Sequence, residues 1–263
     1  MFVRKVYSLL LQISNLLETL FRVKILIIDI FKFAYSQGII KETDIFAKLE
    51  LYNFRTQHRS EIKNNPTFTK KEDIKELYKK IVSYQNNLIT KYLLIFSIHT
   101  AQRQGSIIKI KWKDIDLNEK IWEIPISDMK MRKKHIIPIS DVLLNYLKEL
   151  FILTGDSTYI FPNSQIKSTR NKYPHISNNT VTSALRKMGI SNNEQTAHGF
   201  RAMFKTICKE HQEDYNISNE FVERILAHKV ENDVESAYNR ALNIKEMRII
   251  TNWWSNYLEE LLI

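Results

Sequence analysis

Helical periodicity that is seldom interrupted constrains the fold of this chain more than any other feature. Glycine and proline, the usual residues of turns and loops, number only five each in 263 residues. Apolar residues recur at helical spacing from residue 9 to residue 35, and Gly38 suits the end of that helix. Helical patterns also cover residues 70–112 and most of the chain after Asp141. The sequence therefore predicts a mainly helical protein.

The period changes in one central part of the chain. The segments KIWEIPIS (120–127) and KKHIIPIS (133–140) are short, rich in β-formers and separated by a charged turn, DMKMR (128–132). They predict a two-stranded hairpin, to which WKDIDL (112–117) adds a third strand. The expected fold class is therefore α+β, mainly α with a small antiparallel β-sheet.

A domain boundary is expected near Pro66. Asn64, Asn65 and Pro66 break the chain, and Thr69 is expected to cap the helix that follows. The boundary separates residues 1–65 from residues 66–263. The first sixty residues are all helical in pattern and have more apolar surface than so short a segment can bury. They are expected to pack on something or to be the tail of a larger domain.

Charge and cysteine content narrow the function classes. The net charge is +10 and the pI is about 9.4, which favours polyanionic partners such as nucleic acid or an anionic membrane surface. The single cysteine, Cys208, cannot form an internal disulfide, and no Cys/His cluster has zinc spacing. An intracellular protein without a metal is expected. Charged residues interrupt the apolar segment 6–35, so it predicts neither a membrane span nor a signal peptide.

Several polar residues occur in unusual settings. One arginine directly follows an apolar helical run, a lysine lies in the hairpin turn, and a His-x-x-Arg pair begins another helical pattern. A further histidine precedes a tyrosine by ten residues. Taken singly, each is better explained as surface charge or core packing. The six residues are Arg103, Lys130, His198, Arg201, His228 and Tyr238.

Together these residue types fit one chemistry, the transfer of a phosphodiester. Two guanidinium groups can bind the non-bridging oxygens of a phosphate. Histidines and a lysine can move protons, and a phenol can attack phosphorus and form a covalent intermediate. The cationic side chains would do the work of a divalent metal, so no cofactor is expected.

Four segments carry a resemblance to a known family. They are TAQRQGSIIKIKWKDIDLNEKIWEIP (100–125), MKMRKKHIIPIS (129–140), TAHGFRAMFKT (196–206) and ILAHKVENDVESAYNRA (225–241). In this order and spacing they resemble the catalytic domain of tyrosine recombinases, the phage-integrase family, and most of all integrases of satellite phages and genomic islands. The resemblance runs from Thr67 to the C-terminus. It implies a catalytic domain at 66–263, preceded by a partial helical core-binding (SAM-like) domain at 1–65.

The resemblance also implies how the DNA strand is cut. Tyr238 would attack the scissile phosphate, giving a 3′-phosphotyrosyl enzyme and a free 5′-hydroxyl. Lys130 would be the general acid for the leaving 5′-oxygen. Rejoining would need no ATP, because the phosphotyrosyl bond keeps the energy of the broken bond.

The remaining four residues would act on the phosphate. The resemblance implies that Arg103 and Arg201 bind it, that His198 accepts a proton or contacts it, and that His228 stabilises the transition state. The implied partners are double-stranded DNA at attachment sites, three further copies of the chain in a homotetramer, and a host bending protein or directionality factor. A membrane is not among them, and the expected location is the bacterial cytoplasm, with the nucleoid.

Two departures from the family pattern leave an alternative open. Ser106 stands where family members usually have an acidic residue, which supports the first arginine. The N-terminal part is also shorter than that of typical members. The alternative is a truncated, catalytically impaired DNA-binding remnant. A type IB topoisomerase uses the same chemistry but fits the motifs less well. Trp253 and Trp254 in the last helical pattern are expected to pack in the core or, less favoured, on a neighbouring protomer.

Overall fold

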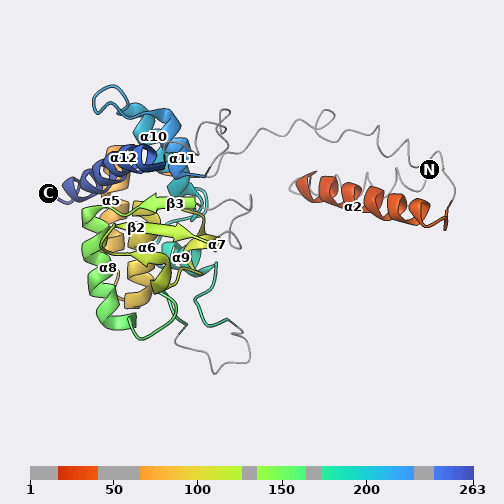
Figure 1. Ribbon diagram of the computed structural model, residues 1–263, viewed down its shortest axis with the longest axis horizontal. Coiled ribbons are helices and arrows are strands. Elements are labelled where there is room, and N and C mark those ends of the chain that lie inside the picture. The colour runs from red at the N-terminus through yellow and green to blue at the C-terminus, as the bar shows by residue number, and fades with distance from the viewer. Residues whose placement is uncertain (1–16, 41–65, 126–134, 164–172, 228–239) are drawn as a thin grey trace. The chain divides into compact units, whose positions relative to one another are not determined.

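The chain forms two compact units, Met1–Asn64 and Asn65–Ile263 (Figure 1). The computed structural model describes residues 17–40, 66–125, 135–163, 173–227 and 240–263. It confirms the expected fold class, since the described residues are mainly helical and include one small three-stranded antiparallel sheet. Within these ranges no helix is long and apolar enough to cross a membrane.

The first unit contains helix α2 (Leu17–Ser36). The helix ends as the sequence predicts, because Gly38 takes a left-handed conformation with φ +68° and its N–H donates to the carbonyl of Tyr35 at 2.9 Å. Large apolar side chains such as Leu26 and Phe33 are exposed on α2. The helical pattern expected before residue 17 lies outside the described residues.

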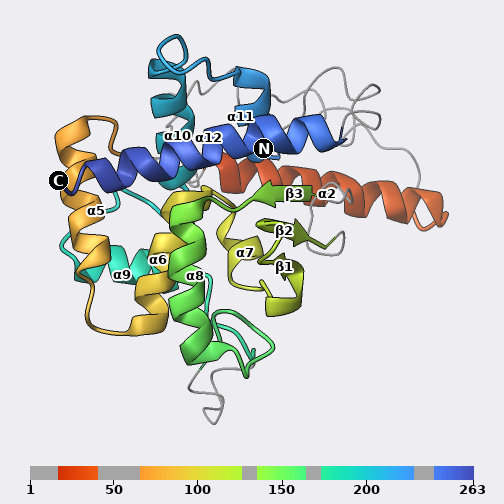
Figure 2. The same ribbon diagram turned by 60° about the vertical axis from the view of Figure 1, so that its left-hand side comes forward.

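The second unit is built around one buried helix, α6, against which α5, α8, α9, α10 and α12 pack, besides the short helical turn that follows it in sequence (Figure 2). Every residue of α6 from Leu93 to Thr100 is buried, as is typical of a helix that is apolar on all sides. Helix α6 spans Leu88–Thr100, and the short helix α11 (Asn219–Ile225) lies between α10 and α12 in sequence. The helices that surround α6 are, in chain order, α5 (Lys71–Val82), α8 (Asp141–Thr154), α9 (Thr180–Lys187), α10 (Gly199–Glu210) and α12 (Arg240–Glu260).

The three predicted strands are confirmed. β1 (Ile115–Asp116) pairs with β2 (Ile121–Ile124), and β2 pairs with β3 (His135–Pro138), all antiparallel. Trp122 of β2 lies opposite Ile137 of β3, and both are buried in the core. The turn between β2 and β3, which contains Lys130, lies outside the described residues.

Two expectations about helix ends are wrong. The helix predicted to run through residue 112 ends at Thr100, because Ala101 takes a left-handed conformation with φ +51°. A single helical turn, α7 (Gln104–Ile107), and a 3-10 turn, η1 (Trp112–Asp114), follow. Two carbonyls at this helix end accept from distant side chains, Ala101 from Arg201 and Ile98 from Trp254, a tertiary effect that periodicity does not encode. Lys70, not Thr69, is the N-cap of α5, and it makes no side-chain cap.

The C-terminal helix α12 packs on its own chain. Trp254 is fully buried, and its indole N–H donates to the carbonyl of Ile98 in α6 at 2.8 Å. This confirms core packing for Trp254. Trp253 is partly buried and stacks on Tyr257.

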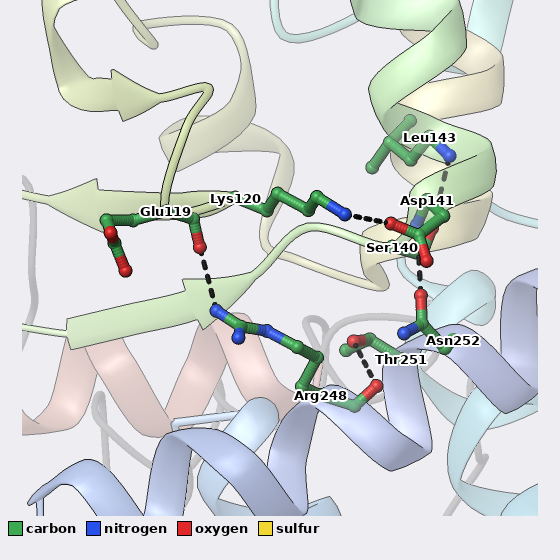
Figure 3. Close-up of polar contacts among 8 residues, drawn as sticks. All are labelled: Glu119, Lys120, Ser140, Asp141, Leu143, Arg248, Thr251 and Asn252. Carbon is green, nitrogen blue, oxygen red and sulfur yellow. Dashed lines mark hydrogen bonds and ion pairs between the residues drawn. The ribbon is translucent and has the colours of Figure 1, made fainter.

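Polar contacts add to the docking of α12 (Figure 3). Arg248 donates to the carbonyl of Glu119 at 2.7 Å, and the side-chain oxygen of Asn252 accepts the N–H of Asp141 at 2.9 Å. Asp141 also pairs with Lys120. The chain that follows residue 239 is therefore attached to the sheet and to α8 of the same molecule.

The central helix α6 carries a buried histidine, His99, that contacts α5 and α12. The ring nitrogens of His99 are 2.8 Å from the hydroxyl of Tyr78 and 2.9 Å from the hydroxyl of Ser255. Burial lowers the pKa of His99 from 6.5 to about 3. The ring is therefore neutral at physiological pH and acts in the folded protein as a hydrogen-bonding group only.

We expect the stability of the second unit to fall as the pH is lowered from 7 to 5. The unfolded chain, in which His99 has a pKa near 6.5, takes up a proton before the folded chain does. Protonation of His99 in the unfolded chain lowers the free energy of unfolding by about 2 kcal/mol between pH 7 and pH 5. Urea unfolding followed by tryptophan fluorescence measures it, because all four tryptophans lie after residue 65. A His99→Gln variant should lose less stability than wild type between pH 7 and pH 5. Equal losses in the two proteins would show that His99 does not cause this pH dependence.

Candidate active site

Arg201 is a buried arginine held between the ends of two helices. It lies in the first turn of α10 and is only 4% exposed. One terminal nitrogen donates to the carbonyl of Ala101 at 2.9 Å, and the other donates to the carbonyl of Leu226. These carbonyls follow the C-termini of α6 and α11, where the helix dipoles are negative. The guanidinium is therefore fixed in place before any ligand binds.

Arg103 brings a second positive charge to this place. It is the N-cap of α7 and is half-buried. Burial, and then the nearby charge of Arg103, lower the pKa of Arg201 to about 10. Arg201 still carries its charge at neutral pH. The charges of the two predicted arginines are thus near enough to influence each other, and two such guanidinium groups are suited to binding an anion such as a phosphate.

His198 stands directly before α10, as its N-cap residue, and its side chain is exposed. It therefore does not share the buried position of Arg201 three residues later. The backbone here is closely packed, since a Cβ on Gly199 would come within 2.4 Å of the carbonyl oxygen of Pro66. Thr67 also donates to the carbonyl of Gly199 at 2.9 Å. These contacts fix the start of α10 and, with it, the positions of His198 and Arg201.

Three predicted site residues, Lys130, His228 and Tyr238, lie outside the described residues. The described residues that border them do meet. His135, the first residue of β3, lies with Nε2 3.1 Å from the carbonyl of Ile225, the last residue of α11. The side chain of His135, five residues after Lys130 in sequence, therefore contacts the main chain three residues before His228.

Two residues of this region were not predicted from the sequence, His135 and Gln102. The side-chain amide of Gln102 donates to the same carbonyl of Ile225 at 2.7 Å. The pKa of His135 is lowered to about 4, mainly by burial and further by the charges of Arg201 and Arg103. In the sequence, His135 is distinguished only as one residue of the predicted strand 133–140, and nothing there marks Gln102.

Comparisons with known proteins agree with the motifs. The model of the phage integrase family matches residues 67–244. Prophage integrase IntA of Escherichia coli K12 is 26% identical over 248 residues, which cover 94% of this chain and 56% of the relative. The integrase of enterobacteria phage P4 is 29% identical over 201 residues, which cover 70% of this chain and 43% of that integrase. The chain thus spans about half the length of the curated relatives it matches.

The fold is also similar to a solved structure. A lambda integrase tetramer bound to a Holliday junction superposes with a TM-score of 0.50 at 18% sequence identity, covering 82% of this chain and 57% of the other. At this identity the likeness concerns the fold alone. The family match covers more than half of the chain and includes Arg103, His198, Arg201 and Tyr238. The chain therefore belongs to the phage integrase family of tyrosine recombinases.

Proposed function

We propose that this protein is a site-specific DNA recombinase that cuts and rejoins strands through a 3′-phosphotyrosyl intermediate, for integration or excision of a mobile element. The observation that carries the proposal is the pair Arg103 and Arg201, in which the buried member is fixed by two helix ends. Two guanidinium groups can together bind several oxygens of one phosphate. The family match, whose range includes Tyr238, supports that residue as the nucleophile that a phosphate site alone would lack.

The two arginines would stabilise the charge of the reacting phosphate. Negative charge on the non-bridging oxygens persists through the transition state, in which phosphorus has five oxygen neighbours. Because Arg201 is already immobilised by main-chain carbonyls, little reorganisation is needed when DNA binds. His198 and His228 would complete the shell around the phosphate, His228 as a hydrogen-bond donor to it.

The covalent step would exchange one phosphodiester for another. The phenolic oxygen of Tyr238 forms a bond to phosphorus and gives up its proton, for which His198 is the acceptor. The bond from phosphorus to the 5′-oxygen breaks, and Lys130 protonates that oxygen as it leaves. The reverse sequence, with a 5′-hydroxyl from another strand as nucleophile, completes strand exchange.

The proposed partner is double-stranded DNA that contains an attachment site. The net charge of +10 supports a polyanionic partner, and the lambda integrase to which the fold is similar was bound to a DNA junction as a tetramer. We propose a homotetramer on DNA, with residues 66–263 as the catalytic domain and residues 1–65 as part of a core-binding domain. A bending protein or directionality factor of the host would assist, in the bacterial cytoplasm at the nucleoid.

A catalytically impaired remnant is the second candidate, and Ser106 favours it. Among the described residues no carboxylate pairs with Arg103, although α7 brings residue 106 within one turn of it. Without such a partner the guanidinium of Arg103 is less firmly oriented. The remnant would bind DNA through the same positive charges and would fail at the covalent step.

We expect Ser106→Glu to raise the rate of strand cleavage about two- to five-fold, because a carboxylate three residues after Arg103 can pair with it. Ser106→Gln is the matched control, since it has the same size without the charge. Single-turnover cleavage at saturating DNA measures the effect. Equal rates for the Glu and Gln variants would contradict an orienting role for the charge.

The proposed function is tested by trapping a covalent complex. Purified protein is incubated with nicked duplexes drawn from the DNA that flanks its own gene, and the products are separated on a denaturing gel. A protein–DNA band that survives denaturation supports the recombinase. Clear DNA binding without any such band supports the remnant.

A further inference from the structure

The end of α11 is held by side chains from three distant parts of the fold. The carbonyl of Ile225 accepts from Gln102 at 2.7 Å and lies 3.1 Å from Nε2 of His135, and the carbonyl of Leu226 accepts from Arg201. We call these three donor side chains the α11 clasp. They come from the loop after α6, from the start of β3 and from α10.

The backbone at the end of α11, which the α11 clasp binds, is not stable by itself. Ala227 has a φ of +51°, a left-handed conformation that costs an alanine about 1 kcal/mol or more. α11 has only seven residues, too few for a helix that is stable by itself. The hydrogen bonds of the clasp therefore determine where the chain leaves α11, one residue before His228.

The hydrogen bond of His135 requires one protonation state. A carbonyl only accepts, so Nε2 of His135 must carry the hydrogen. Since the neighbouring groups Arg201 and Arg103 are cationic, a second proton on the ring is disfavoured, and the pKa near 4 agrees with this. His135 is thus a neutral donor at physiological pH.

We propose that His135 and Gln102 are positioning residues that join the end of the Lys130 segment to the beginning of the His228–Tyr238 segment. Both segments would then be set relative to Arg201, which belongs to the same clasp. The inference rests on the proposed function for the roles of Lys130, His228 and Tyr238. Neither positioning residue touches the phosphate; they act through the main chain of α11.

The test compares two variants of His135 in the full chain. His135→Gln keeps an N–H donor at a similar reach, whereas His135→Leu has similar bulk and no donor. We expect His135→Leu to reduce single-turnover cleavage at saturating DNA about 10- to 100-fold, while DNA affinity stays within about two-fold. His135→Gln should restore most of the rate. A Leu variant that cleaves like wild type, or a Gln variant as impaired as Leu, would overturn the proposal.

Hydrogen exchange supplies a readout that does not depend on activity. Peptides that span residues 222–240 should exchange faster in His135→Leu than in wild type or His135→Gln, with little change in α5 and α6. Unchanged exchange there would overturn the clasp even if the wild type proves inactive. Absence of cleavage by wild type, with the expected exchange pattern, would refute the proposed function and leave the clasp intact.

Gln102→Met is a second variant that tests the same proposal if His135→Leu does not fold. Methionine has a similar length and no N–H donor, so the carbonyl of Ile225 loses its shorter hydrogen bond. We expect the same pattern of slower cleavage and faster exchange in residues 222–240. Wild-type values for both quantities in this variant would also overturn the proposal.

Discussion

Tyr238→Phe should abolish covalent attachment to DNA and leave DNA binding within about two-fold of wild type. The substitution removes one oxygen, the atom that would attack phosphorus, and changes neither the charge nor the bulk of the side chain. The phosphate contacts proposed for Arg103 and Arg201 do not involve the phenol, so affinity should persist. A gel-shift titration measures binding, and a denaturing gel measures attachment on the same nicked duplex.

A second tyrosine provides the matched control for this prediction. Tyr173 is 68% exposed and is not among the six predicted site residues, so Tyr173→Phe should attach to DNA as wild type does. Covalent attachment by the Tyr238→Phe variant would show that another residue is the nucleophile.

Arg201→Ala should reduce strand cleavage by a factor of about 10² to 10³ or more. An arginine that stabilises charge in the transition state contributes more to the rate than to DNA affinity, because many other cations also bind the DNA backbone. Single-turnover cleavage at saturating DNA isolates this effect from binding.

The same substitution should lower the free energy of unfolding by about 2–5 kcal/mol. Arg201 is the donor to the carbonyls of Ala101 and Leu226, and buried carbonyls that lose their donor are costly. Rates must therefore be measured where urea unfolding shows the variant to be folded. Arg201→Lys separates the two effects, since it keeps the charge but cannot donate to both carbonyls from a planar fork.

Arg224→Ala is the control for loss of one positive charge. Arg224 forms an ion pair with Glu220 along α11, and surface pairs of this spacing contribute only about 0.3–0.5 kcal/mol. We expect near-normal cleavage from this variant. If Arg201→Ala cleaves within about ten-fold of wild type while it is fully folded, Arg201 does not stabilise the transition state.

Local patterns were sufficient to predict most of the fold. The hairpin of β2 and β3 follows from short β-rich segments, and the end of α2 follows from Gly38. The end of α6 was missed because Ala101 takes a conformation that alanine usually avoids. The carbonyl of Ala101 accepts a hydrogen bond from Arg201, which lies 100 residues later in the chain. A contact with a residue so distant in sequence does not change the pattern of apolar residues near residue 101, so that pattern could not predict where α6 ends.

The candidate site was predicted only in part for a similar reason. Chemistry-bearing residue types in a family order indicated Arg103 and Arg201, and the structure brings their charges together. Gln102 and His135 act on a main-chain carbonyl that lies 123 and 90 residues away in sequence. Any residue at position 225 offers that carbonyl, so the sequence at α11 holds no signal for either contact. The roles of all six predicted site residues remain predictions.

The most direct test of a phosphotyrosine mechanism is to map the covalent adduct. The trapped complex is digested with protease and nuclease, and the peptide that carries a nucleotide is sequenced by mass spectrometry. We predict a 3′-linked nucleotide on Tyr238 and, on the released strand, a 5′-hydroxyl that polynucleotide kinase can label directly. A nucleotide on any other residue, or a 5′-linked adduct, would contradict the proposed reaction.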